Sequence, residues 1–143
     1  MSRGFRFHEH TADITIECWG PTFEDAFEEA GHAIYEVIVD TSTVEPQESV
    51  EIEVDGIDMQ ELLVEWGGQL IALMEIEEQF YSKFEVAKLK ETSDGYYLKG
   101  RIWGESIDLE KHDTRTEVKA MTYADMKIEE GPHKIELWFT LDL

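Results

Sequence analysis

With 143 residues, the chain has the length of one compact domain, and we treat residues 1–143 as a single unit. Its 33 acidic residues outnumber 12 basic ones, and the net charge of −21 argues against direct nucleic-acid binding, because that affinity comes from basic side chains that replace counterions. The sequence begins without the apolar core of a signal peptide. Its longest clear apolar run, Leu70–Met74, is far shorter than the roughly 20 residues that span a bilayer. We therefore expect a cytoplasmic protein without membrane contact.

The first feature along the chain is the polar stretch FRFHEHTADITIE at residues 5–17, which runs into an alternating strand. On a strand His8 and His10 would point to the same side, as in some zinc sites, but the other histidines have no metal-type spacing. The alternative is a polar turn between two strands. Asp13 begins the strand, where aspartate is disfavoured and must be solvated, hydrogen-bonded or balanced by a cation. Cys18 is expected to be a small buried side chain and not a reactive thiol.

Two segments have the three- and four-residue apolar spacing of amphipathic helices, at about 22–39 and 58–77. Thr22 is the expected N-cap of the first helix. Asp58 and Glu61 have capping-box spacing at the start of the second.

The pair Gly67-Gly68 lies inside the second predicted helix, where each glycine costs about 1 kcal/mol relative to alanine. It indicates either a weak or kinked helix or a close backbone contact at this point.

The remaining segments alternate with period two and predict strands. Ser93-Asp94-Gly95 and Gly131-Pro132 mark hairpin turns. Because the strands come in runs instead of alternating strictly with helices, the expected class is α+β, a mostly antiparallel sheet or sheets with two packed helices. The expected strands are Ile14 to Cys18, Val50 to Val54, Phe84 to Lys90, Tyr96 to Trp103, Val118 to Tyr123, Met126 to Glu129 and Ile135 to Leu141.

The last segment, KIELWFTLDL, alternates to its end, so the chain is expected to finish inside a strand. That would hold the α-carboxylate of Leu143 beside the side chain of Asp142. If this edge lies near Asp13, three oxygen donors converge and repel one another unless they hold a hard cation such as Ca²⁺ or Mg²⁺. The alternative is a frayed end with a solvated Asp142.

The sequence leaves the roles of two further residues open. Lys119 stands between Val118 and Ala120 in an apolar-leaning strand, and is either an exposed sheet residue or a functional cation that faces a carboxylate cluster or a partner. Asp40 follows the first helix and either caps a turn or adds an oxygen ligand. The chain has no nucleophile elbow, phosphate-binding glycine loop, CxxC pair or HExxH helix, so no catalytic motif stands out.

With HEHTADI, EVKAMTY and the final LDL in view, the whole chain resembles the archease family of small acidic proteins. The resemblance is nearly colinear, and each piece is short. The matching segments are GPTFEDAF at 20–27, DTSTVEP at 40–46, FEV at 84–86, WGE at 103–105 and EVKA at 117–120.

The resemblance implies a protein cofactor and not a stand-alone enzyme. Archeases look like activators of the RtcB-type RNA ligase that joins tRNA exons; they accelerate its guanylylation by GTP and its repeated turnover. The family also implies a Ca²⁺ site, with Mg²⁺ or Mn²⁺ as exchangeable ions, and has been described as chaperone-like. The ligands carried over onto this chain are Asp13, Asp142 and Leu143. The further positions of interest are Lys119, His10 and Asp40.

Two departures from the family pattern stand out. Gly67-Gly68 replaces bulkier helix formers, and Ala124 stands where relatives often have a histidine. Two other function classes stay open. One is a small hydrolase with zinc or manganese at His8, His10 and Asp13. The other is a general acidic chaperone or adaptor, in which the aspartates are dispensable.

Overall fold

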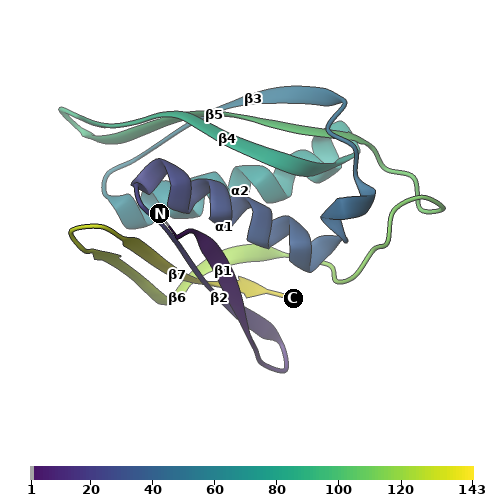
Figure 1. Cartoon of the computed structure of the whole chain (residues 1–143), viewed down its shortest axis with the longest axis horizontal. Helices are drawn as coiled ribbons and strands as arrows, with labels where there is room; N and C mark the ends of the chain where they lie inside the picture. Colours follow the sequence, from purple (N-terminus) through teal and green to yellow (C-terminus); the bar gives the residue numbers. More distant parts are fainter. Residues whose placement is uncertain (1) are drawn as a thin grey trace.

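Two antiparallel sheets enclose two helices in the computed structural model, which describes residues 2–143 (Figure 1). One sheet lies on each side of the helical pair, so three layers share one core. The α+β class predicted from the sequence is confirmed. Within the described residues, no helix is long and apolar enough to cross a membrane.

The four-stranded sheet has the strand order β1-β2-β7-β6 and contains both ends of the chain. The first strand, β1, was implied only by the polar-turn alternative, and its Phe5 and Phe7 pack against the core. The strands of this sheet are β1 (Gly4–Glu9), β2 (Asp13–Gly20), β6 (Ala120–Glu130) and β7 (Ile135–Asp142).

The three-stranded sheet has the order β3-β5-β4 and covers the other side of the helices. The predicted turn at Ser93-Asp94-Gly95 connects β4 to β5, and its glycine has a φ of 148°, which favours glycine. The strands are β3 (Glu48–Gly56), β4 (Gln79–Thr92) and β5 (Gly95–Ser106).

The helices α1 (Phe23–Ile38) and α2 (Met59–Glu77) begin at the predicted caps. The Thr22 hydroxyl accepts from the backbone N–H of Asp25 at 3.1 Å, and the Asp58 carboxylate accepts from that of Glu61 at 2.8 Å. Each bond satisfies one of the donors that a helix N-terminus leaves free. Both helices therefore match the predicted ranges to within a residue.

The core lies between the helices and both sheets, and two of its large polar side chains are hydrogen-bonded to main-chain carbonyls. The indole N–H of the fully buried Trp66 donates to the carbonyl of Phe27 at 2.9 Å, and the Tyr35 hydroxyl donates to that of Leu70 at 2.6 Å. Cys18 is fully buried, as expected, and burial raises the pKa of its thiol.

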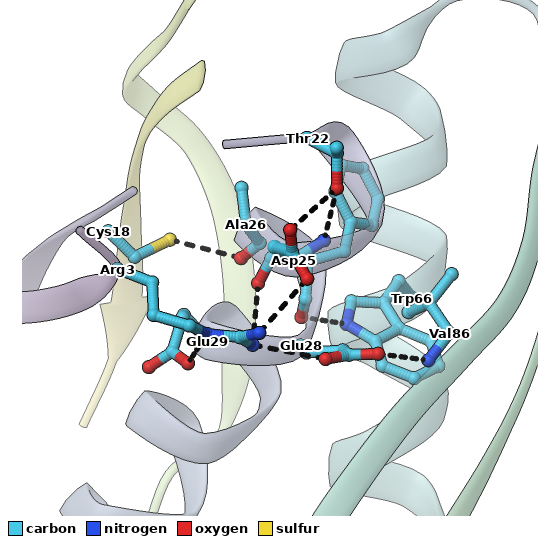
Figure 2. Close-up of polar contacts among 10 residues, drawn as sticks. Arg3, Cys18, Thr22, Asp25, Ala26, Glu28, Glu29, Trp66 and Val86 are labelled. Atoms are coloured by element: carbon cyan, nitrogen blue, oxygen red, sulfur yellow. Dashed lines mark hydrogen bonds and ion pairs between the residues drawn. The ribbon is translucent and has the colours of Figure 1, made fainter. Parts of the chain in front are cut away.

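Arg3 binds three carboxylates on the first turns of α1 (Figure 2). Its guanidinium lies 2.9 Å from Asp25, 3.0 Å from Glu28 and 2.6 Å from Glu29. The second oxygen of Glu28 accepts from the backbone N–H of Val86 at 2.9 Å. The N-terminal segment, α1 and β4 are thus joined by one carboxylate, and Arg3 offsets the repulsion of its acidic neighbours.

The two adjacent glycines of α2 do not interrupt the helix, and they differ in their surroundings. A Cβ on Gly67 would overlap the methyl group of Met121 and lie 3.0 Å from its sulfur, so Gly67 permits a close contact between α2 and β6. A Cβ on Gly68 would meet nothing within 4 Å. The close-contact interpretation therefore holds for Gly67 and leaves Gly68 unexplained.

The two predicted strands, Val118 to Tyr123 and Met126 to Glu129, correspond to one strand, β6, which begins at Ala120, two residues later than predicted, and has an irregularity between the two segments. The pairing with β7 shifts between Thr122 and Lys127, and Asp125 has a φ of 56°. Ala124 lies in this bulge, where its N–H donates to the hydroxyl of Thr122 at 3.2 Å. Bulges re-aim side chains at sheet edges, and this one interrupts the ladder a few residues after β6 begins at Ala120.

Candidate functional site

The register of the four-stranded sheet places Asp13 directly opposite Asp142. Asp13 begins β2, Asp142 ends β7, and Ala120 at the start of β6 faces Asp142 from the other side. Side chains at directly opposed positions share a face of the sheet, with Cβ atoms about 5 Å apart, and like charges there are destabilising. Two aspartates therefore face each other across β2 and β7, where β6 also begins.

Leu143 is tied to this sheet end. Its N–H donates to the carbonyl of Ala12 at 3.1 Å, and its side chain packs against the core. The end of the chain is therefore not frayed, because the residue after Asp142 continues the pairing with the segment before Asp13, although the side chain of Asp142 is exposed.

Lys119 completes the group, which we call the strand-end cluster: Asp13, Asp142, Leu143 and Lys119. The N–H of Lys119 donates to the carbonyl of Asp142 at 2.8 Å. Its side chain is exposed, while Val118 before it is buried. In residues 2–143 its ammonium forms no ion pair within 4 Å. Lys119 is thus an exposed cation whose backbone is tied to that of Asp142.

The two histidines of the opening stretch do not form a metal-binding pair. His10 is exposed in the turn between β1 and β2, where its N–H donates to the carbonyl of Asp13 at 3.0 Å. His8 lies on β1 and stacks on Trp138 of β7, with ring centroids 5.2 Å apart. The polar-turn interpretation is therefore the correct one, and His10 fixes the backbone of Asp13.

Asp40 caps a turn and lies outside the strand-end cluster. Its carboxylate accepts from the Ser42 hydroxyl at 2.7 Å and from the Ser42 N–H at 3.1 Å, at the start of the 3₁₀ turn η1 (Thr41–Thr43). These bonds, with a smaller contribution from Arg115, lower the pKa of Asp40. The oxygen-ligand alternative for Asp40 has no support in this geometry.

A buried hydroxyl pair reinforces the register next to the cluster. Thr15 and Thr140, one step inside Asp13 and Asp142 on the same face, lie 2.9 Å apart through their hydroxyl oxygens and are almost fully buried. This pair was not predicted from the sequence. Alternation showed each threonine on a strand, but the partnership depends on which strands are neighbours.

The loop that leads to Lys119 is anchored by Glu105 and His112. The buried imidazole accepts from the N–H of Asp108 through Nδ1 at 3.0 Å, so its Nε2 carries the proton and donates to Glu105 at 3.0 Å. The backbone N–H of Glu45, together with His112 and Lys111, lowers the pKa of Glu105 to about 2. Glu105 thus ties the 107–119 loop to the β5 end.

Glu105→Gln is expected to destabilise the protein by about 1–2 kcal/mol at pH 7. Because folding lowers the pKa of this carboxyl, its contribution is present above the unfolded value near 4.5 and is lost as the pH falls through about 2. Urea unfolding of both proteins at pH 7 and pH 3 measures this. Their free energies of unfolding should converge in acid, and an equal difference at both pH values would contradict the assigned role.

The donor chemistry of the strand-end cluster suits a hard cation. Its side-chain acceptors are carboxylate oxygens, which Ca²⁺ and Mg²⁺ prefer. Within residues 2–143, no three His, Cys, Asp or Glu side chains lie together as a metal site. His8, His10 and Asp13 do not form such a group either.

Comparison with known proteins shows one consistent similarity. Residues 5–143 match the archease protein family. The chain is 44% identical over 139 residues to the protein archease of Sulfurisphaera tokodaii, covering 97% of this chain and 98% of that protein, and 45% identical over 125 residues to that of Pyrococcus abyssi, covering 87% of each.

Two solved structures resemble the fold. The solution structure of protein 1598 of Methanobacterium thermoautotrophicum matches with a TM-score of 0.85 and 38% identity, over 98% of this chain and 99% of that one. The crystal structure of an archease, described as a possible chaperone, from Thermotoga maritima matches with a TM-score of 0.54 and 21% identity, over 95% of this chain and 94% of that one.

Proposed function

The chain belongs to the archease family, and on that premise we propose that it is a non-catalytic protein cofactor of an RtcB-type RNA ligase. In this role it promotes guanylylation of the ligase by GTP and its multiple turnover in tRNA splicing. The observation that carries the proposal is the strand-end cluster, in which Asp13 of β2 meets Asp142 of β7 beside Lys119.

The proposal assigns a Ca²⁺ ion, exchangeable with Mg²⁺ or Mn²⁺, to Asp13, Asp142 and the carboxylate of Leu143. Opposed carboxylates are unfavourable by themselves, and a divalent cation offsets that repulsion. The ion would supply a positive charge that organises acidic groups of the cofactor and the ligase. Lys119 and the backbone of His10 position and flank the carboxylates without ligating the ion.

The charge of the chain supports a basic protein partner. A ligase that holds RNA presents basic surface, and an acidic partner with a net charge of −21 is attracted to it at long range. The same charge disfavours direct binding of RNA by this chain. The hydrolase alternative has no support, since His8 stacks on Trp138 and His10 is exposed in a turn.

The test is a guanylylation assay of the cognate ligase with GTP and substoichiometric cofactor. We expect the wild-type protein to increase both the rate of guanylylation and the number of ligation turnovers, and to give no ligation alone. Calorimetric titration with Ca²⁺ should show one site. Absence of stimulation would refute the cofactor role, whereas stimulation without binding of any divalent ion would refute only the metal assignment.

A further inference from the structure

A groove runs along α2 directly beside the strand-end cluster. One wall is the α2 face from Val64 through Gly68 to Glu75, and the other is the segment 117–121, which contains Lys119. Its volume of about 490 Å³ is in the range of sites that hold small ligands or inserted side chains. We call it the α2 groove.

The α2 groove is apolar at its base and adaptable in shape. Val118 and Met121 are nearly buried in the core, and Ile71 and Met74 are half-buried along α2. Methionine side chains are flexible and polarisable, and they recur on surfaces that accept apolar groups from a partner. The groove thus offers an apolar contact that the fold does not itself fill.

Gly68 has no role within the fold that explains it. It lies in the helix interior without a positive φ, and a Cβ there would meet nothing within 4 Å. Alanine would therefore be tolerated and would stabilise the helix by up to about 1 kcal/mol. Glycine instead leaves the α2 groove open at its middle, which is what the close approach of another molecule requires.

The rim of the α2 groove is acidic. The groove shares Met74 and Glu75 with a second hollow that reaches Leu109, whose side chain is 74% exposed. Together the two carry four acidic residues and one basic residue, a local net charge of −3. These charged residues are Glu75, Glu77, Glu78, Glu117 and Lys119. An apolar base with an acidic rim complements an apolar side chain that is flanked by basic residues.

We propose that the α2 groove docks an apolar side chain carried by a basic segment of the ligase, and so places the strand-end cluster against that partner. The inference rests on the proposed function, because it assigns the contact surface of the same partner. The groove shares Lys119 with the cluster, so one approach of the ligase engages both. Docking then sets affinity, and the carboxylates act once the complex has formed.

Gly68→Leu tests the inference, with Gly68→Ala as the matched control. A Cβ at this position meets nothing within 4 Å, so we expect the leucine side chain to extend into the groove and the melting temperature to be unchanged or higher. The cofactor concentration for half-maximal stimulation of the ligase should rise at least about tenfold, as expected for loss of an apolar anchor. Stimulation at saturation and Ca²⁺ affinity should stay as in the wild type. Gly68→Ala should change the half-maximal concentration less than threefold.

Glu75→Lys tests the charge of the rim, with Glu91→Lys on the exposed end of β4 as its control. Both variants change the net charge equally, but only Glu75 lies on the groove. We expect Glu75→Lys to weaken ligase binding more than Glu91→Lys at low salt, and the difference to shrink as salt screens it.

The outcomes separate this inference from the proposed function. If the wild type stimulates the ligase and Gly68→Leu does so at the same half-maximal concentration, the groove is not the docking site and the cofactor role stands. If the wild type fails to stimulate the ligase, both the docking inference and the proposed function are refuted. A concentration-dependent dimer of the wild type that Gly68→Leu abolishes in sedimentation would assign the groove to a second copy of the chain and overturn the inference.

Discussion

The double variant Asp13→Asn/Asp142→Asn is expected to lose stimulation of the ligase almost completely and to bind Ca²⁺ at least about 100-fold more weakly. The substitution keeps the shape of both side chains and removes two negative charges from opposed positions of β2 and β7. Neutral amide oxygens bind a divalent cation much less strongly than carboxylates do.

Compared with the wild type, the same variant should be equally or slightly more stable without the metal and less stable with it. In metal-free buffer, loss of the like-charge repulsion leaves the variant as stable as the wild type or slightly more stable. With free Ca²⁺ at 100 times the dissociation constant, the wild type should gain about 2.7 kcal/mol and the variant almost nothing. Thermal unfolding with and without Ca²⁺ measures both.

The matched control is Asp55→Asn/Asp94→Asn, which changes the net charge by the same amount at two exposed positions outside the cluster. It should retain stimulation and the gain in stability with Ca²⁺. Full stimulation by Asp13→Asn/Asp142→Asn would refute the metal-site account and favour an acidic adaptor that uses only its surface charge.

The helices were predictable from the sequence because their signals are local. Apolar spacing and the capping residues Thr22 and Asp58 lie within a few positions of one another, and the observed ends follow them. Cys18 was likewise predictable as a buried residue from the alternation of its own strand.

The strand-end cluster was only partly predictable. Alternation indicated that β7 runs to the end of the chain and that Asp13 begins β2, but no periodic pattern specifies that these strands are neighbours across 125 residues, as the Thr15–Thr140 pair requires. The resemblance to archeases implied that Asp13 and Asp142 belong to one site. The α2 groove had no sequence signal beyond Gly68, since it depends on how α2 packs against β6.

Two further interpretations are decided by local geometry. The bulge of β6 places Asp125 in a left-handed conformation that alternation does not indicate, so two strands were expected where one bent strand exists. Asp40 could cap or ligate, and its bonds to Ser42 decide in favour of capping.

Gly104→Ala is expected to destabilise the protein by about 3 kcal/mol or more and to lower its melting temperature by roughly 10 °C. Gly104 lies on β5, the central strand of the three-stranded sheet, opposite Glu48 on one side and Tyr81 on the other. A Cβ there would overlap the carbonyl oxygen of Phe80 and lie 2.7 Å from its carbon. These are backbone atoms of β4, so no side-chain rotation relieves the clash and the two strands must separate locally.

The same glycine-to-alanine change at Gly68 is the control, because there a Cβ meets open space. Gly68→Ala should raise the free energy of unfolding by about 0.5–1 kcal/mol, through helix propensity and a less flexible unfolded chain. Chemical denaturation of the two variants beside the wild type gives the comparison. The two substitutions should change the free energy of unfolding with opposite signs, because the surroundings of the two glycines differ. A Gly104→Ala protein as stable as the wild type would mean that β4 and β5 do not approach this closely.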